Sequence, residues 1–401
     1  MNFLNVFSLP RAMLGILNGS KAIGGPLRVS LSLTNRCNLR CIHCYYYSPY
    51  LEYPTYNKQR LAKQMMQPSP DDDYFKSYQR TDADIDRMRG LINEALKLGV
   101  MRFQFTGNGE VFLYENILEL LERAKYGGSH CLAYTNGTLL TPDIIDELIK
   151  MEFDELRISI LAGSKEMYLR THPGTGRNTF AKLKKSLLYI AEKKAELKEK
   201  KPQLTLVYVV MNENFEGIFD FAQFAAFVNA DRVVFNPIDE VGDAGLANLL
   251  LSEEQADHAR KQLIKAKQYL ETKKIVNNIS FFLRVFRGQL DTKSLYSIIP
   301  CYYGWLTTIV EPDGNVYPCC RCYKPLGNIY ENSFRDIWYG KHYTQFRKNA
   351  LKINRTKATI SGCDCNSCNH YTVNIRVYNF FHPIKGRTAL NKSEFHSVTG
   401  V

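Results

Sequence analysis

Six short runs rich in β-branched and aromatic residues, most of them followed by a helical pattern, dominate the chain between residues 26 and 237. The runs cover residues 26–33, 100–105, 129–134, 155–160, 204–210 and 231–237. Helical periodicity follows at 82–98, 113–126, 141–151, 178–194 and 215–227. Strands that alternate with helices pair in parallel through right-handed crossovers. The alternation therefore predicts an α/β sheet that is either doubly wound or curled into a partial barrel.

Polar residues gather where each predicted strand ends. They are Thr34 and Asn35, residues 106–110, residues 135–137, Ser159, Asn212 and Asn236. In parallel α/β architectures the ligand site lies at the carboxyl ends of the strands. We therefore expect a polar ligand site at this edge of the sheet.

The first of these ends runs directly into Cys37, Cys41 and Cys44, a C-x3-C-x2-C pattern short enough for one loop to wrap a metal centre. A structural zinc ion needs four ligands, and no fourth cysteine completes the set, although His43 is adjacent. An iron–sulfur cube held by three cysteines keeps one iron open for another ligand. The spacing favours such a cube, with a zinc knuckle as the alternative.

Seven further cysteines crowd the last quarter of the chain: Cys301, Cys319, Cys320, Cys322, Cys363, Cys365 and Cys368. The turn at residues 312–314 predicts a hairpin that returns Cys319 to the neighbourhood of Cys301. We find no secretory signal and no apolar run of eighteen residues, so we expect a cytoplasmic protein whose thiols hold metal rather than disulfides. Iron–sulfur and zinc ligation both fit this region. Cys131, alone in an apolar strand, is predicted to be a buried free thiol.

The formal net charge of +12 is spread thinly, so it favours anionic partners only weakly, and we expect no nucleic-acid partner. Residues 1–25 are predicted to form a helical extension. Its apolar residues could contact a membrane surface, and packing against the barrel explains them equally well.

The three-cysteine loop, with His43 before the third cysteine, resembles the signature of radical S-adenosylmethionine (radical SAM) enzymes. The strand and helix alternation over residues 26–240 resembles the partial (β/α)6 barrel of that family. The resemblance implies a [4Fe–4S] cluster on Cys37, Cys41 and Cys44 whose open iron binds S-adenosylmethionine. One electron, from a donor such as a flavodoxin or ferredoxin, then cleaves this cofactor to a 5′-deoxyadenosyl radical that abstracts hydrogen.

The segment from Thr106 to Val111 (TGNGEV) looks like the Gly-Gly-Glu-Pro loop of the family, which binds the methionine ammonium group. Asn108 and Val111 depart from that pattern. By the same resemblance, the cofactor-binding residues are His43, Gly107, Gly109, Glu110, Thr135, Asn136, Ser159, Arg170 and Asn212. Arg177 is the alternative to Arg170 as the arginine that binds the carboxylate of the cofactor.

The cysteine-rich segment resembles the SPASM or shorter "twitch" extension of radical SAM enzymes. This resemblance assigns Cys301, Cys319, Cys365 and Cys368 to one auxiliary [4Fe–4S] cluster and leaves Cys320, Cys322 and Cys363 as surplus ligands for a second. The expected organisation is a partial barrel followed by a small cysteine-rich α+β domain. Its parts are residues 1–25, a barrel over 26–240 with a substrate lid or inert insertion at 45–80, a helical bridge over 241–298, the auxiliary domain over 299–375, and a tail over 376–401.

The expected function is hydrogen abstraction from a peptide or a small polar metabolite such as a carbohydrate, with the auxiliary cluster assisting electron transfer. Asp239 and Glu240 are the candidates for a general base. The competing hypothesis is a non-catalytic metal-binding protein or electron carrier that uses the same cysteines. The outcome of the reaction stays open.

Overall fold

The structure, a computed structural model, describes residues 7–50, 81–238, 246–286, 295–356, 359–365, 368 and 370–383. Most of the predicted lid, residues 51–80, lies outside the described residues, as do the general-base candidates Asp239 and Glu240.

The six predicted strands are all present and pair in parallel in sequence order. They are β1 (Arg28–Ser32), β2 (Arg102–Thr106), β3 (His130–Thr135), β4 (Glu155–Ser159), β5 (Gln203–Val210) and β6 (Arg232–Pro237). They belong to a ten-stranded sheet with the order β10-β9-β8-β1-β2-β3-β4-β5-β6-β7. The two ends of this order do not pair with each other, so the sheet is open and the predicted partial barrel is confirmed.

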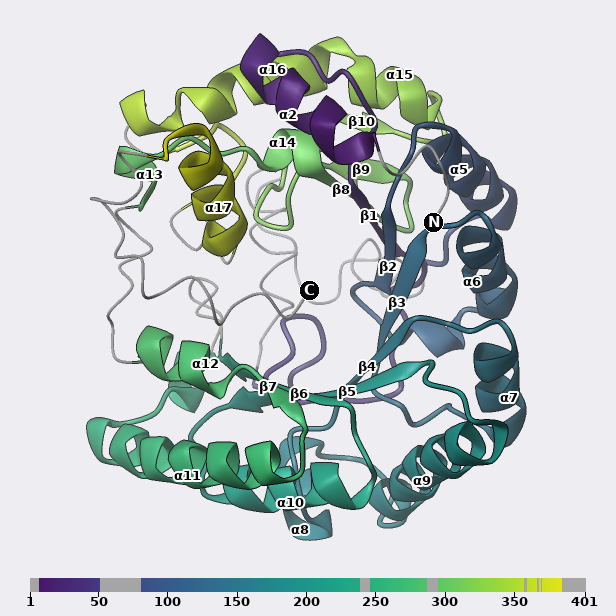
Figure 1. The fold of residues 1–401 in the computed structure, drawn as a ribbon, viewed down its shortest axis with the longest axis vertical. Helices are drawn as coiled ribbons and strands as arrows, with labels where there is room; N and C mark the ends of the chain where they lie inside the picture. The colour runs from purple at the N-terminus through teal and green to yellow at the C-terminus, as the bar shows by residue number, and fades with distance from the viewer. Residues whose placement is uncertain are drawn as a thin grey trace.

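Helices cover the outer side of the curved sheet (Figure 1). They are α5 (Ile85–Lys97), α6 (Ile117–Tyr126), α7 (Pro142–Lys150), α9 (Thr179–Leu197) and α10 (Ile218–Phe227). Side-chain caps define several starts: Asp84 accepts a hydrogen bond from the main-chain N–H of Arg87 at 2.9 Å before α5. A short helix α8 (Lys165–Thr171) and the 3-10 turn η1 (Val111–Leu113) were not predicted, because they are too short to show a helical period, whereas the 3-10 turn η2 (Phe215–Gly217) occupies the first residues of the helical segment predicted over 215–227.

The main core lies between the sheet and these helices. Phe103, Phe105, Ile158 and Leu206 are fully buried in it. Burial alternates along β2, where Phe103 and Phe105 are buried and the residues that alternate with them are partly exposed, as expected when one face of a strand packs on helices. Cys131 in β3 is fully buried, as predicted, and burial raises the pKa of its thiol.

The region after β6 contains both helices and a strand. It comprises η3 (Leu246–Leu249), α11 (Glu253–Thr272), β7 (Val276–Asn277) and α12 (Ile279–Phe286). A capping box formed by Ser252 and Gln255 begins α11. The two-residue strand β7 pairs in parallel with β6, so this segment extends the sheet as well as bridging to the next region.

The cysteine-rich region continues the same sheet at its other end. Its elements are α13 (Leu295–Ile298), α14 (Tyr303–Leu306), β8 (Thr307–Val310), β9 (Asn315–Tyr317), β10 (Gly327–Asn328), α15 (Phe334–Tyr339), α16 (Lys341–Leu351), η4 (Ile353–Arg355) and α17 (Tyr371–Phe381). β8 pairs in parallel with β1, and the predicted turn joins β8 to the antiparallel β9. The auxiliary region is therefore hydrogen-bonded, through β8, to the strand that leads into Cys37.

The amino-terminal helix α2 (Ser8–Asn18) packs against this region. Ala12 and Ile16 share a small core with Trp305, whereas Leu14 and Leu17 are exposed. None of the described helices combines the length and apolar character that crossing a membrane requires.

Candidate active site and auxiliary metal centre

The segment that leads from β1 into the three-cysteine loop is anchored to the residue segments before α5 and after β2. Thr34 Oγ1 donates to the carboxylate of Asp82 at 2.5 Å, and Arg36 forms an ion pair with the same carboxylate at 2.6 Å. Arg36 also donates from Nη2 to the carbonyl oxygen of Leu113 at 2.8 Å. These contacts fix the backbone that enters Cys37.

The middle of the loop is tied to the end of β3. Asn38 donates from Nδ2 to Thr138 Oγ1 at 2.8 Å, and Asn136 Nδ2 donates to Asn38 Oδ1 at 2.8 Å. The ends of β1 and β3 are thus connected through a residue that stands next to Cys37.

The glycine–glutamate loop after β2 lies directly on the segment before Cys37. A Cβ atom on Gly109 would lie 2.2 Å from the carbonyl oxygen of Arg36, and the N–H of Glu110 donates to that oxygen at 2.8 Å. Gly107 has a φ of +146°, which side-chain-bearing residues rarely adopt. Asn108 donates from Nδ2 to Asn35 Oδ1 at 3.0 Å, so its side chain links the two loops.

Glu110 is a buried carboxylate, only 2% exposed. It accepts hydrogen bonds from Thr135 Oγ1 at 2.5 Å and from the main-chain N–H groups of Asn136 and Phe112 at 2.7 and 3.2 Å. Burial nevertheless raises the pKa of Glu110. Within the described segments, no lysine, arginine or histidine forms an ion pair with it. A buried carboxylate without a protein counter-cation suits a cationic ligand such as an ammonium group.

The cysteine thiols and His43 are in a desolvating environment. Burial raises the pKa of Cys37 to about 11, and it also raises the pKa values of Cys41 and Cys44. Burial lowers the pKa of His43 to about 4, so its imidazole is neutral at pH 7, and its Nδ1 atom has no hydrogen-bond partner among the residues that the structure describes. Binding of a metal centre must therefore displace the thiol protons.

The spacing of the three thiols bears on the choice between zinc and a cluster. Two ligands of one ion can be separated by at most about 4.6 Å, twice a metal–sulfur bond length. In the part of the chain that the structure covers, the trio Cys37, Cys41 and Cys44 does not bring its sulfur atoms within 4.8 Å of one another. This loop is wider than a single zinc ion needs, and the donor set of three thiols fits an iron–sulfur cluster.

The remaining predicted cofactor residues are placed unequally. Thr135 and Asn136 both donate to Glu110, whereas the guanidinium of Arg170, at the exposed end of α8, lies 3.2 Å from the sulfur of Met167. Among the residues described, Ser159, at the end of β4, makes no hydrogen bond to Glu110 or to the groups that contact it. Asn212 donates to the carbonyl oxygen of Asn248 at 2.7 Å, and its buried Oδ1 has no hydrogen-bond partner within the described part of the chain.

A stacked pair of aromatic rings lies beside the cysteine loop and was missed in the sequence. Tyr168 and His172 stack with centroids 4.2 Å apart. The N–H of Ile42, between Cys41 and His43, donates to the carbonyl oxygen of Thr171 at 3.1 Å. The aromatic residues four positions apart near α8 were the available signal.

The auxiliary thiols gather in a separate small core. Tyr296, Tyr303 and Cys319 are among its buried members, and it is contacted by Cys301, Cys320, Cys365 and Cys368. The hydroxyl of Tyr296 lies 2.9 Å from Cys368 Sγ. A hydrogen bond between the two thiols lowers the pKa of Cys320 and raises the pKa of Cys319. The donor set fits a thiolate-bound metal centre.

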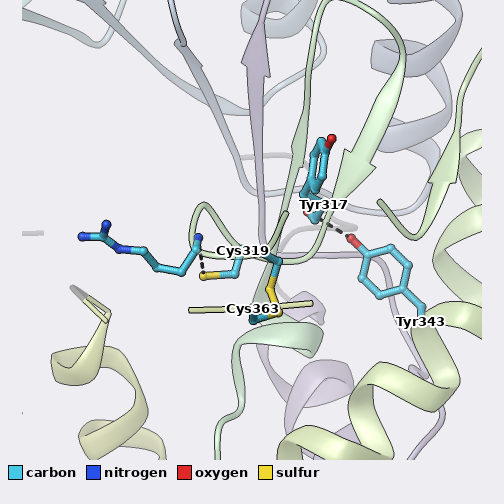
Figure 2. The surroundings of a disulfide bond; sticks show 6 residues. Tyr317, Cys319, Tyr343 and Cys363 are labelled. Atoms are coloured by element: carbon cyan, nitrogen blue, oxygen red, sulfur yellow. Dashed lines mark hydrogen bonds between the residues drawn. A yellow bond between two sulfur atoms is a disulfide. The ribbon is translucent and has the colours of Figure 1, made fainter. Parts of the chain in front are cut away.

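Cys322 and Cys363 form a disulfide, with Cys319 beside it (Figure 2). Neither can offer a thiolate in this state, which corrects the expectation that the thiols of this region hold metal rather than disulfides. The two residues face each other in an isolated antiparallel bridge, reinforced by a hydrogen bond from the N–H of Asp364 to the carbonyl oxygen of Arg321 at 2.8 Å. A sequence separation of 41 residues did not reveal this pairing.

His370 was also missed in the sequence, because it lies two positions beyond the last cysteine. Its Nε2 atom is 3.1 Å from Cys320 Sγ. Over the described ranges, Cys319, Cys320 and His370 are the only histidine, cysteine or acidic residues whose ligand atoms form a group of three within 4.8 Å.

Comparison with known families identifies both regions. Residues 31–225 match the Radical SAM superfamily, and residues 301–369 match SPASM, an iron–sulfur cluster-binding domain. The chain belongs to the radical SAM superfamily. It is a radical SAM enzyme of the SPASM type, and its cofactors are S-adenosylmethionine, a [4Fe–4S] cluster and an auxiliary cluster.

Three relatives show what this radical SAM protein is similar to. The antilisterial bacteriocin subtilosin biosynthesis protein AlbA of Bacillus subtilis (strain 168) is 22% identical over 331 residues, which is 80% of this chain and 61% of AlbA. The tungsten-containing aldehyde ferredoxin oxidoreductase cofactor-modifying protein of Pyrococcus furiosus is 24% identical, covering 83% of this chain and 88% of that protein. The PqqA peptide cyclase of Granulibacter bethesdensis is 24% identical, and the match covers 79% of this chain and 74% of the cyclase.

A solved structure shares the fold. Streptococcus suis SuiB bound to its precursor peptide SuiA superposes with a TM-score of 0.58 at 16% identity, covering 86% of this chain and 73% of SuiB. At this identity the likeness concerns the fold alone.

Proposed function

We propose that this protein modifies a peptide by radical chemistry that starts from S-adenosylmethionine. The site observation that carries the proposal is Glu110, a buried carboxylate without a protein counter-cation in the described residues, held against the loop of Cys37, Cys41 and Cys44. The peptide substrate is supported by the names of relatives: a bacteriocin biosynthesis protein, a peptide cyclase, and SuiB with its precursor peptide.

The proposed roles follow from the contacts at the first site. Cys37, Cys41 and Cys44 hold the cluster, and Glu110 receives the ammonium group of S-adenosylmethionine. When bound, the reduced cluster and S-adenosylmethionine together supply a carbon radical that removes hydrogen from the substrate. The glycines before Glu110 let the loop approach the cysteine segment closely, and the buried surroundings exclude water from the site.

Further roles are proposed for residues around this centre. His43, Ser159, Arg170 and Asn212 complete the cofactor site, and the buried Oδ1 of Asn212 is suited to accept a hydrogen bond from the cofactor. Asp239 and Glu240 stay predictions for the general base. The auxiliary centre, on Cys301, Cys319, Cys365 and Cys368, takes or relays an electron. A flavodoxin or ferredoxin in the cytoplasm is the proposed electron donor.

Anaerobic reconstitution tests the enzymatic part of this proposal. Protein loaded with iron and sulfide, then given dithionite and S-adenosylmethionine, should release 5′-deoxyadenosine that mass spectrometry detects. The Cys37/Cys41/Cys44→Ala variant should release none above the protein-free background. Equal release from both proteins would favour the competing hypothesis of a metal-binding protein or electron carrier.

Deuterium transfer tests the substrate class. If a short peptide is encoded beside this gene, its deuterated form should pass deuterium into 5′-deoxyadenosine and change in mass. A deuterated sugar provides the comparison, because a carbohydrate substrate was also expected. Transfer from the sugar and none from the peptide would overturn the peptide proposal and leave the cleavage chemistry intact.

A further inference from the structure

The imidazole of His370 lies among the auxiliary thiols at a distance that suits a shared metal atom. Nε2 is 3.1 Å from Cys320 Sγ, and both atoms lie within 4.8 Å of Cys319 Sγ. A metal bound by one imidazole nitrogen and one thiolate separates these atoms by at most about 4.4 Å, the sum of the two bond lengths. The pair from His370 and Cys320 therefore needs no large rearrangement to bind one metal atom.

Packing fixes the orientation of this ring. It stacks on Tyr303 with centroids 4.2 Å apart and planes 13° from parallel. The hydroxyl of Tyr303 accepts a hydrogen bond from Arg28 in β1, and Arg28 also donates to Thr307 Oγ1 in β8 at 3.3 Å. The ring is thus held by the strands that join the barrel to the auxiliary region.

His370 also connects the two cysteine segments of this region. Its main-chain N–H donates to Cys368 Sγ at 3.3 Å, while its ring reaches Cys320, fifty positions away in the sequence. One residue therefore contacts thiols that precede and follow the disulfide-linked bridge of Cys322 and Cys363.

We propose that His370, through Nε2, and Cys320 ligate one metal atom of the auxiliary region, in addition to the centre assigned to Cys301, Cys319, Cys365 and Cys368. The inference rests on the proposed auxiliary metal centre and adds a mixed thiolate and imidazole ligand pair to it. An imidazole is a neutral ligand, and replacement of thiolates by histidines raises the reduction potential of iron–sulfur centres. His370 would therefore make the auxiliary centre easier to reduce than a centre held by thiolates alone.

Nitrogen-sensitive electron paramagnetic resonance tests the ligand directly. The Cys37/Cys41/Cys44→Ala protein, which retains the auxiliary thiols, is labelled with ¹⁵N-histidine, loaded anaerobically with iron and sulfide, and reduced. We expect a ¹⁵N coupling typical of a metal-bound imidazole. The same protein loaded with Co²⁺ instead provides a second readout, because the visible ligand-field bands report the ligand set.

Three variants separate ligation from packing. His370→Phe preserves an aromatic ring against Tyr303 and should lose the ¹⁵N coupling and shift the cobalt bands. His370→Cys should retain metal with a lower midpoint potential, because a thiolate adds negative charge. His342→Ala removes an exposed histidine of the same region and should leave every signal unchanged.

Absence of the nitrogen coupling, or its persistence in His370→Phe, would overturn the proposal. Failure of the protein to retain either metal would overturn it as well. These readouts do not use cofactor cleavage, so release of 5′-deoxyadenosine by the wild-type protein would survive either result. A failure of His370 ligation is thereby distinguished from a failure of the proposed function.

Discussion

Glu110 and Glu155 form a matched pair for testing the proposed ammonium site by substitution with glutamine. Both are buried, at 2% and 4% exposed, but their surroundings differ. Glu155, at the start of β4, pairs with Arg157 at 2.7 Å and accepts a hydrogen bond from Thr205 at 2.8 Å. Glu110, at the opposite edge of the sheet, has hydrogen bonds and no protein cation among the described residues.

The two carboxylates have opposite pKa shifts. Burial raises the pKa of Glu110 and outweighs its three hydrogen bonds. For Glu155 burial also acts upward, but Arg157 prevails and the pKa is lowered. An acid with a raised pKa contributes stability below the unfolded value, near 4.5, and loses it as pH rises through the folded pKa. An acid with a lowered pKa contributes above that value and loses its contribution as pH falls through the folded pKa.

We therefore expect different losses of stability at pH 7 in the absence of S-adenosylmethionine. Glu110→Gln removes an unfavourable buried charge but turns one amide N–H₂ toward a main-chain N–H, so the free energy of unfolding should change by no more than about 1.5 kcal/mol. Glu155→Gln removes the charged partner of Arg157 and should lower the free energy of unfolding by about 1–3 kcal/mol.

The affinity for S-adenosylmethionine should show the reverse pattern, with the larger loss in Glu110→Gln and no loss in Glu155→Gln. Loss of one partner from a buried charge pair costs about 2–5 kcal/mol. With about 1.4 kcal/mol for each tenfold change, Glu110→Gln should weaken S-adenosylmethionine binding roughly 30-fold to several thousand-fold. Glu155→Gln should leave the dissociation constant unchanged, because it lies at the amino end of its strand.

Calorimetric titration of anaerobically reconstituted protein with S-adenosylmethionine measures the affinities, and urea unfolding without the cofactor measures stability. Wild-type affinity should fall as pH drops through the raised pKa of Glu110, and the Glu110→Gln protein should lack this dependence. If the Glu110→Gln protein bound S-adenosylmethionine as tightly as the wild type, the assignment of Glu110 to the ammonium group would be contradicted. Equal loss of affinity in both variants would indicate a general disturbance of the fold.

Gly109→Ala should reduce the iron bound per chain, measured by iron content and visible absorbance, because its Cβ would lie 2.2 Å from a main-chain carbonyl of the cysteine loop. Gly90→Ala, in α5 with no atom within 4 Å, should retain iron and gain about 0.5–1 kcal/mol of stability. Asp154→Asn removes ion pairs to Lys125 and Lys201 at 2.8 and 2.7 Å and should cost about 1–3 kcal/mol in urea unfolding at pH 7. Burial acts to raise the pKa of Asp154, but the two lysines outweigh it and the pKa is lowered. The stability difference between wild type and Asp154→Asn should therefore shrink as pH falls below about 3.8. A stability difference that stays constant with pH would contradict this assignment.

Local patterns in the sequence were sufficient to predict β1 to β6 and the larger helices between them, because strand and helix periods depend on neighbouring residues. The turn at residues 312–314 was predictable for the same reason, since its residue types favour a hairpin. The sequence also predicted that the Glu110 loop would meet the cysteine loop. Both follow parallel strands, and the carboxyl ends of such strands share one edge of a sheet.

Only the tertiary structure decided which distant segments meet. β8 lies beside β1, Cys322 faces Cys363, and His370 reaches Cys320, although spacing along the chain did not reveal any of these contacts. The raised pKa of Glu110 likewise depends on the tertiary structure, because desolvation and the presence of nearby cationic side chains depend on every element packed around the carboxylate. Sequence patterns determined the strands and pointed to the three cysteines proposed as ligands of the first site, whereas the path of the chain determined which groups surround them.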